Sequence, residues 1–184
     1  MWAPQMDELA EAGYHVVAPD LLGHGKSPKM VSLELGDWDD QILGLLKEIG
    51  KGKCTLIGVS MGGVIAQHFA ANYPERVSKL VLSDSFGELK TTTEKLLGLS
   101  QVLGFRIYRV LGSRLLAKGM ASAYKAPFAT LARDYFSRIS LEADFKQLIL
   151  ARKAINKVNL IGKIDGEQVP TLVMVGEDFG ESFV

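Results

Sequence analysis

The sequence of 184 residues has one cysteine, no net charge and no long apolar run. The single cysteine, Cys54, cannot form an intrachain disulfide and gives no sign of an oxidising compartment. No apolar stretch reaches the roughly 18 residues that span a bilayer. The N-terminus lacks the basic region followed by an apolar stretch that is typical of a signal peptide. We therefore expect a cytoplasmic protein.

Charge and composition exclude two further classes. Lys plus Arg and Asp plus Glu each number 21, so no bulk positive charge attracts nucleic acid. The 19 glycines and 6 prolines are too few for a collagen-like or disordered chain. Hydrophobic residues make up 47% of the sequence, which is enough to form one domain with a buried core.

The zero net charge hides two parts of opposite charge. Residues 86–165 contain fourteen Lys or Arg and six Asp or Glu, whereas the rest of the chain contains seven and fifteen. This difference predicts two compositionally distinct parts within one chain.

Outside the basic stretch, short apolar segments alternate with helical patterns. Apolar and β-branched runs predict buried strands, and apolar residues at helical spacing predict helices between them. The strands are expected at residues 14–18, 54–59, 77–83 and 170–175, and the helices at residues 3–12, 38–49 and 62–72. Strands separated by helices indicate a parallel sheet covered on both faces, so the predicted fold class is α/β.

The basic stretch has no comparable strand pattern. It predicts helices at about residues 91–104, 105–119, 126–138 and 141–157, broken at glycines and at Pro127. We expect residues 87–165 to form a helical cap over the carboxyl edge of the sheet. This cap would be inserted between the two parts of a core domain, residues 1–86 and 166–184.

One motif carries the chemistry. Gly58-Val59-Ser60-Met61-Gly62 lies between an apolar strand and an apolar helix, which is the arrangement of a nucleophile elbow. Glycine is expected at both flanks because side chains at positions 58 and 62 would collide with the neighbouring strand and helix. Ser60 is then the candidate nucleophile, and the backbone N–H of Met61 is a candidate donor to a developing oxyanion. The alternative is an ordinary strand-to-helix turn that contains a serine.

Three further segments accompany the motif in chain order. They are Pro19-Asp20-Leu21-Leu22-Gly23-His24-Gly25-Lys26-Ser27, Tyr73-Pro74-Glu75-Arg76-Val77 and Pro170-Thr171-Leu172-Val173-Met174-Val175-Gly176. Together with the elbow they resemble the α/β-hydrolase superfamily, specifically its capped esterase, lipase and peptidase-like members. The resemblance implies the α/β-hydrolase fold, a mostly parallel sheet flanked by helices with an inserted helical cap.

The same resemblance implies an incomplete chain. A Ser-His-Asp mechanism in this fold needs a histidine last in chain order, after an eighth strand, but no histidine follows His68. The third strand and its oxyanion loop also lack a counterpart, which leaves a gap between residues 14–18 and 54–59. We expect an internal fragment of a longer protein, without the N-terminal strands and without the last strand and helix.

The triad acid has two candidates. The family pattern Gly-x-x-Asp after the seventh strand reads Gly176-Glu177-Asp178-Phe179 here, with phenylalanine at the expected position. Asp178, one residue early, is the leading candidate. Asp84, which follows the strand at residues 77–83, resembles the acid of some lipase-like relatives and is the alternative acid. A turn carboxylate is the structural alternative for both.

Other reactive side chains are interpreted as structural. His15 lies in a predicted strand, His24 shapes the loop after it, and His68 lies inside a helix. Cys54, inside a strand, is interpreted as a small buried hydrophobe.

The stretch Gly23 to Ser27 also resembles a phosphate-binding loop, but two positions exclude it. That motif needs a glycine where the chain has Asp20, and a helix where Pro28 follows.

An apolar stripe with basic neighbours is predicted on the cap. The apolar residues are Leu99, Leu103, Ile107, Val110, Leu111 and Leu115, and the basic ones are Arg106, Arg109, Arg114 and Lys118. The favoured interpretation packs the stripe on the sheet and leaves the basic groups solvated. The alternative is a lipid-facing lid or a binder of anionic acyl substrates, so contact with a membrane surface stays open.

These patterns predict a serine hydrolase that cleaves a carboxylic ester, or an amide or thioester, through an acyl-enzyme on Ser60. The substrate is expected to be a small apolar molecule, and no cofactor, metal or nucleic acid is expected. Because the base would lie outside the chain, the 184 residues alone are expected to be inactive. The alternative is a non-catalytic binding protein that keeps the fold but has lost its triad, as Phe179 suggests. The sequence does not indicate the oligomeric state.

Overall fold

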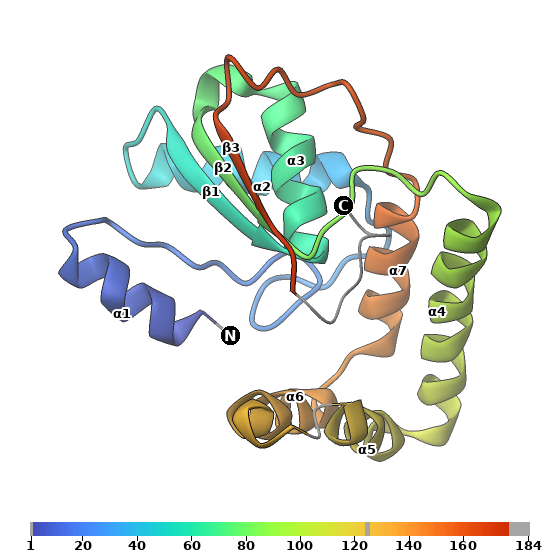
Figure 1. The fold of residues 1–184 in the computed structure, drawn as a ribbon. Helices are drawn as coiled ribbons and strands as arrows, with labels where there is room; N and C mark the ends of the chain where they lie inside the picture. Colours follow the sequence, from blue (N-terminus) through green and yellow to red (C-terminus); the bar gives the residue numbers. More distant parts are fainter. Residues whose placement is uncertain (1, 124–125, 177–184) are drawn as a thin grey trace. The chain divides into compact units, whose positions relative to one another are not determined.

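The computed structural model describes residues 2–123 and 126–176 (Figure 1). The chain divides into two compact units. The helical unit comprises Met1–Lys29 with Gly104–Leu148, and the sheet unit comprises Met30–Leu103 with Ile149–Val184. The division into core and cap at residues 86 and 165 stays a prediction.

The sheet unit has three described strands, all parallel. They are β1 (Cys54–Val59), β2 (Val77–Ser83) and β3 (Thr171–Met174), in the order β1-β2-β3 (Figure 1). The first two match their predicted bounds, and β3 is one residue shorter at each end than predicted. The α/β class is therefore confirmed.

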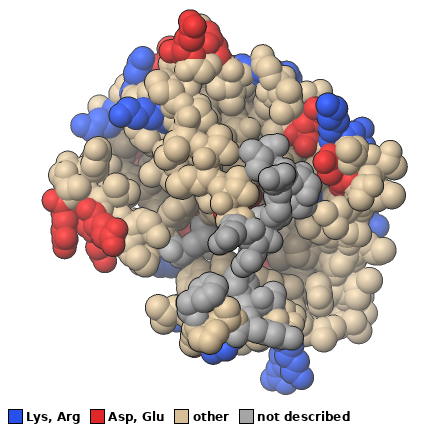
Figure 2. Space-filling model, in the orientation of Figure 1, with Lys and Arg blue, Asp and Glu red and all other residues tan. Residues whose placement is uncertain are grey.

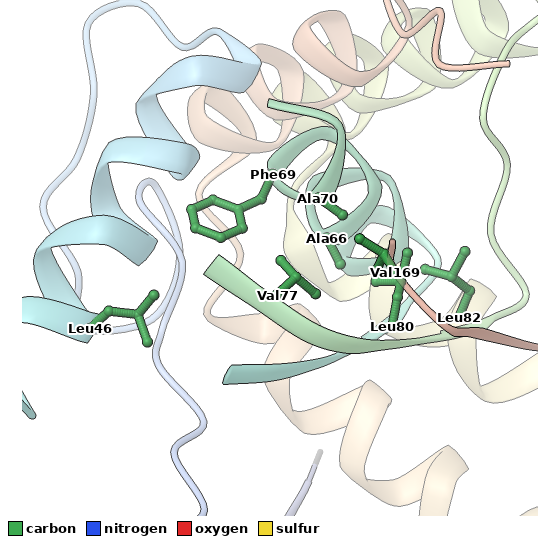
Figure 3. Packing of buried hydrophobic residues seen from close by; sticks show 8 residues of the cluster. All are labelled: Leu46, Ala66, Phe69, Ala70, Val77, Leu80, Leu82 and Val169. Atoms are coloured by element: carbon green, nitrogen blue, oxygen red, sulfur yellow. The ribbon is translucent and has the colours of Figure 1, made fainter. Parts of the chain in front are cut away.

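Two helices build the core of this unit. α3 (Met61–Asn72) packs on the sheet, and α2 (Leu35–Glu48) packs against α3. Figure 3 shows the side chains that meet there: Leu46 from α2, Ala66, Phe69 and Ala70 from α3, Val77, Leu80 and Leu82 from β2, and Val169. Phe69 and Leu80 are fully buried, and burying a side chain of this size contributes about 1.5–3 kcal/mol to folding. This packing anchors the helix that begins at the elbow.

The other face of the sheet is open within the described residues. Thr55 and Lys79 are exposed, and Ile57 is 44% exposed. The expectation of a sheet covered on both faces is therefore wrong for the described part of the chain. The sequence pattern identifies apolar strands, but it does not show which elements cover them.

Of the two elements predicted in the N-terminal segment, the helix forms in the described structure and the strand does not. α1 (Ala3–Glu11) forms as expected and is closed by Gly13, whose φ of +88° turns the chain so that the Tyr14 N–H bonds back to the Leu9 carbonyl at 3.0 Å. The buried strand predicted at residues 14–18 is absent from the described structure, and Tyr14 is 67% exposed. A strand needs a neighbour for its backbone N–H and C=O groups, and no described strand pairs with this segment.

The helical region has the four predicted helices, with several boundaries shifted by a few residues and the first break shifted by about eight. Its elements are α4 (Thr92–Leu111), α5 (Ser113–Ala123), α6 (Thr130–Leu141) and α7 (Phe145–Ile155), with short 3-10 turns at Pro74–Arg76 (η1) and Pro127–Ala129 (η2). The predicted break at residues 104–105 is wrong, because α4 continues through Gly104. It ends instead at Gly112, which has φ +91°.

The apolar stripe predicted on the cap is exposed. Its six side chains, from Leu99 to Leu115, have exposed fractions between 43% and 85%. The favoured interpretation, in which the stripe packs on the sheet, is therefore not met by the described residues. Among those residues, no helix combines the length and the apolar character that crossing a bilayer requires.

The charged side chains of one face appear in Figure 2. Lys and Arg lie there in separate groups with uncharged surface between them. Apart from this view, one cation of the sheet unit is paired with an acid: Lys157 Nζ lies 2.7 Å from Glu34 Oε1. No continuous positive patch is visible on the described part of the face shown in Figure 2.

A pH dependence follows from one ion pair of the helical unit. Lys29 Nζ lies 2.7 Å from Asp144 Oδ2, and this hydrogen bond lowers the pKa of the Asp144 carboxyl. A depressed carboxyl pKa adds stability above the unfolded-state pKa, and that stability is lost as the pH falls through the folded-state pKa. Lys29→Met should therefore lower the thermal midpoint slightly at pH 7, because the pair is largely exposed, and leave it unchanged near pH 2. Melting curves of both proteins at the two pH values test this, and an equal loss at both would contradict it.

Candidate active site

The carboxyl ends of the three parallel strands meet at one edge of the sheet. Val59 of β1 pairs with Ser83 of β2, and Ser83 pairs with Met174 of β3. Ser60 and Asp84 follow directly after β1 and β2. The structure therefore brings the candidate nucleophile and the alternative acid to the same edge.

Ser60 has an unusual backbone conformation. Its φ is +51° and its ψ is −119°, a combination that residues with a side chain rarely adopt. The Ser60 N–H donates to the Ser83 carbonyl at 2.9 Å, and the Ser60 carbonyl accepts from the Ser85 hydroxyl at 3.0 Å. β2 and the residues after it thus hold Ser60, whose side chain is exposed, in a strained turn.

The glycines of the motif have different roles from those predicted. A Cβ at Gly58 would lie 2.6 Å from the backbone carbon of Gly62, so a side chain there collides with the start of α3 as expected. A Cβ at Gly62 meets nothing within 4 Å among the described residues, so the predicted collision at that position is wrong. The second close approach is one residue later, where a Cβ at Gly63 would lie 2.5 Å from the Ser85 Cβ. The reason is that the first turn of α3 directs position 63, rather than position 62, at the residues after β2.

Met61 is the first residue of α3. The first N–H groups of a helix have no intrahelical acceptor, and the helix dipole makes this end attractive to an anion. The carbonyl of Ser60 already accepts the N–H groups of Gly63 and Val64, at 3.0 and 3.2 Å. The geometry is compatible with the predicted role of the Met61 N–H as an oxyanion donor.

His68 has a structural partner away from the elbow. Its Nδ1 lies 2.8 Å from Oδ2 of Asp39, a buried carboxylate of α2, and the Asn72 amide donates to the same oxygen at 3.0 Å. His68 is also eight residues after Ser60, which is roughly 12 Å along a helix. The contacts favour the structural interpretation of His68 and give Ser60 no base from this side chain.

The loop after residues 14–18 is built around Asp20. The Asp20 carboxylate accepts the Lys26 N–H at 2.9 Å and lies against Gly25, where a Cβ would clash with it. The Ser27 hydroxyl donates to the Asp20 carbonyl at 2.6 Å. His24 Nδ1 lies 3.2 Å from the Leu22 carbonyl oxygen, as a loop-shaping residue would. No helix follows within the described loop, in agreement with the exclusion of a phosphate-binding loop.

The structure describes one of the two candidate acids, Asp84, but not the other. Asp178 and its neighbour Phe179 lie outside the described residues. Asp84 has φ +47°, and its Oδ1 accepts the Gly176 N–H at 2.7 Å. Its Oδ2 accepts the Ser83 hydroxyl at 2.7 Å.

Cys54 is half-buried at the start of β1. Burial raises the pKa of its thiol, and the charge of Arg76 lowers it to a smaller degree. The protonated thiol is a poor nucleophile, which agrees with its predicted role as a small hydrophobe.

Sequence reasoning missed two residues that support the elbow. Ser85 donates to the Ser60 carbonyl, as described above. The amide of Gln67, a buried residue of α3, donates to the Gly63 carbonyl, the Ser85 hydroxyl and the Phe86 carbonyl at 3.2–3.3 Å. The sequence offered one signal for Gln67, which stands among the apolar residues of the helix. A polar side chain that becomes buried there requires hydrogen-bond partners.

This strained serine between a parallel strand and a helix is the architecture of an α/β hydrolase. Residues 1–113 match the family described as alpha/beta hydrolase fold, and the chain belongs to this family.

Its relatives are hydrolases. The chain is 46% identical over 79 residues to 2-hydroxy-6-oxononadienedioate/2-hydroxy-6-oxononatrienedioate hydrolase of Burkholderia vietnamiensis, covering 42% of this chain and 27% of the relative. It is 38% identical over 106 residues to 2-hydroxymuconate semialdehyde hydrolase of a Pseudomonas species, covering 56% and 36%. A thermophilic esterase from Thermogutta terrifontis superposes with a TM-score of 0.80 at 25% identity, covering 96% of this chain and 66% of that one. The chain thus spans about a quarter to a third of the curated relatives it matches.

Proposed function

We propose that the chain is part of a serine hydrolase that cleaves a carboxylic ester, or an amide or thioester, through an acyl-enzyme on Ser60. One observation carries the proposal: an exposed serine with φ +51° stands where β1 enters α3, held through its N–H by Ser83 of β2 and through its carbonyl by Ser85, two residues later. Strained backbone of this kind is concentrated at functional sites, and this position is the nucleophile elbow of the family. The hydrolase names of the relatives support the same class.

The chemistry follows from this arrangement. The Ser60 oxygen attacks the carbonyl carbon of the ester while a base takes the hydroxyl proton. The N–H of Met61 donates to the oxyanion of the tetrahedral intermediate, at the positive end of α3. The base then gives the proton to the leaving alcohol. In the second half of the reaction water attacks the acyl carbon while the base takes its proton, and the base returns that proton to the Ser60 oxygen as the acid leaves.

The base in this proposal is a histidine outside the 184 residues. His68 is engaged with Asp39, and His24 lies against a backbone carbonyl. We call the longer protein that supplies the base the parent protein. Asp178 or Asp84 would orient the histidine.

The substrate proposed is a small apolar ester, bound without a cofactor or a metal. The relatives' names include dienedioate substrates, whereas the superposed structure is an esterase. A substrate panel of p-nitrophenyl esters of increasing chain length and 2-hydroxy-6-oxononadienedioate separates these classes. A cytoplasmic location and a cap at residues 87–165 complete the proposal.

A fluorophosphonate probe tests the nucleophile directly. The probe should label the parent protein at one site, and mass spectrometry should place the label on the peptide that contains Ser60, because only an activated serine reacts quickly. The 184-residue chain should show no ester turnover, since it lacks the base. Turnover by that chain would contradict the assignment of an external base. An unlabelled parent protein would contradict the serine hydrolase and favour a non-catalytic binding protein of the same fold.

A further inference from the structure

Three donors converge on the Ser60 carbonyl oxygen. Two are N–H groups of the first turn of α3, from Gly63 at 3.0 Å and from Val64 at 3.2 Å. The third is the Ser85 hydroxyl, which belongs to the segment after β2 and lies 3.0 Å from the same oxygen. Any helix supplies bonds of the first kind from its own backbone. The third bond is specific to this fold, because it needs a hydroxyl at position 85.

The direction of this carbonyl fixes the direction of the Met61 N–H. The two groups belong to one planar trans peptide unit, in which the C=O and the N–H point in opposite directions. The Ser60 carbonyl is turned toward its donors in α3, so the Met61 N–H points away from them, out of the start of the helix. A rotation of the peptide plane moves both groups together. Whatever holds the carbonyl therefore also holds the N–H that the proposed mechanism uses for the oxyanion.

Gln67 determines which way the Ser85 hydroxyl donates. The Gln67 Nε2 atom lies 3.2 Å from the carbonyl oxygens of Gly63 and Phe86, and 3.3 Å from Ser85 Oγ. Backbone carbonyls only accept hydrogen bonds, so this end of the glutamine is its NH₂ group, which only donates. The Ser85 oxygen accepts from Gln67, and its single proton is left for the Ser60 carbonyl.

The neighbouring residues of α3 admit this relay and strengthen it. A Cβ at Gly63 would collide with the Ser85 side chain, so the missing side chain lets the hydroxyl approach the helix. Gln67 is buried one turn further along the same helix. Hydrogen bonds in a chain polarise one another, so a hydroxyl that accepts from Gln67 is a stronger donor to Ser60. Its donation to that carbonyl polarises the peptide in turn, which makes the Met61 N–H a stronger donor as well.

We propose that Ser85, directed by Gln67, is a positioning residue for the oxyanion site: its hydroxyl fixes the Ser60–Met61 peptide and so aims and strengthens the Met61 N–H. This inference rests on the proposed function and extends the site beyond the residues of the motif. In this role neither side chain touches the substrate, because both act through the Ser60 carbonyl.

Ser85→Ala in the parent protein tests the role by separating kcat from KM. Removing an oxyanion donor lowers kcat by about 10²- to 10³-fold, and misdirecting one should cost less, so kcat should fall about 10- to 50-fold. KM for a p-nitrophenyl ester should stay within about twofold, because the donor acts on the transition state. A trifluoromethyl ketone, which forms a tetrahedral adduct on a serine, should lose affinity by the same factor as kcat. Ser85→Cys, with a weaker donor in the same place, should fall between alanine and wild type.

Thr171→Val is the matched control. It also removes a hydroxyl that donates to a backbone carbonyl of the sheet unit, since Thr171 Oγ1 lies 2.8 Å from the Val169 oxygen. Thr171 begins β3, at the opposite end of the strand from the candidate site. This variant should keep the kcat and the inhibitor affinity of the wild type. Equal losses of kcat in Ser85→Ala and Thr171→Val would reduce the Ser85 bond to general support of the fold and overturn the proposal.

A second measurement observes the peptide without catalysis. The pair Ser-Met occurs once in the 184 residues, so carbonyl ¹³C in serine and ¹⁵N in methionine together mark the Ser60–Met61 peptide. The NMR signal of this peptide in the parent protein is assigned by its absence from Ser60→Ala. Ser85→Ala should move the carbonyl resonance upfield and shift the Met61 amide with it, whereas Thr171→Val should leave both in place. An unmoved signal in Ser85→Ala would overturn the proposal even where a fluorophosphonate labels Ser60.

The two measurements also distinguish this inference from the proposed function. A moved signal in a parent protein that takes no fluorophosphonate label would overturn the serine hydrolase, and the positioning role with it, although the contact itself would stand. A labelled parent protein whose kcat is unchanged by Ser85→Ala would overturn the positioning role alone.

Discussion

Ser60→Ala should lower ester hydrolysis by the parent protein by about 10⁶-fold, the loss that follows removal of a serine nucleophile from a complete triad. The reason is that the acyl-enzyme cannot form, while the Met61 N–H and the rest of the site remain to bind the substrate. KM should change little, because the alanine removes one exposed hydroxyl. Steady-state kinetics on a p-nitrophenyl ester measure both quantities.

The control for this variant is Ser78→Ala, an exposed serine of β2 away from the sheet edge. It should keep full activity and full fluorophosphonate labelling. Residual labelling of Ser60→Ala at the wild-type rate would assign the nucleophile to another residue and remove the basis of the proposed function.

The parts of the fold that the sequence predicts well are those specified locally. β1 and β2 are short apolar runs bounded by turn residues, and α2 begins where Asp37 accepts the Glu34 N–H at 2.7 Å. Both kinds of signal depend on neighbours a few residues apart. Their bounds were therefore predicted to within a few residues.

The failures concern partners that are distant in the sequence. Residues 14–18 have the composition of a buried strand, but a strand forms only beside another, and the described structure offers it none.

Gly104 and Gly112 look alike in the sequence, yet only Gly112 adopts a positive φ and ends α4. Glycine permits a helix end without requiring one.

The candidate site also has one part that the sequence predicts and another that it does not. The motif locates Ser60, because the strand-to-helix pattern is local. It does not reveal that Ser85 and Gln67 support the elbow, since these residues reach it through the fold from 25 and 7 positions away. The motif also treats its two glycines as equivalent, and the structure separates them.

The different surroundings of Gly58 and Gly62 predict a large loss of stability and reactivity from alanine at position 58 and little effect from alanine at position 62. A Cβ at Gly58 would lie 2.6 Å from the backbone atoms of Gly62 and Gly63, and backbone cannot rotate away as a flexible side chain can. Gly58→Ala should therefore displace the first turn of α3, lower the free energy of unfolding by about 3 kcal/mol and slow fluorophosphonate labelling of the parent protein by about 100-fold. Denaturant titration and labelling rates measure the two effects.

Gly62→Ala is the matched control, because it adds the same methyl group four residues later in the same motif. Nothing described lies within 4 Å of that methyl group, and alanine is the better helix former by about 1 kcal/mol. The unfolding free energy should stay the same or rise, and Ser60 should still be labelled. Equal damage from both substitutions would mean that the elbow excludes side chains at both glycines, as the motif alone predicts. Damage confined to Gly58→Ala would show that one close approach of backbone to backbone, at the start of α3, maintains the strained conformation of Ser60.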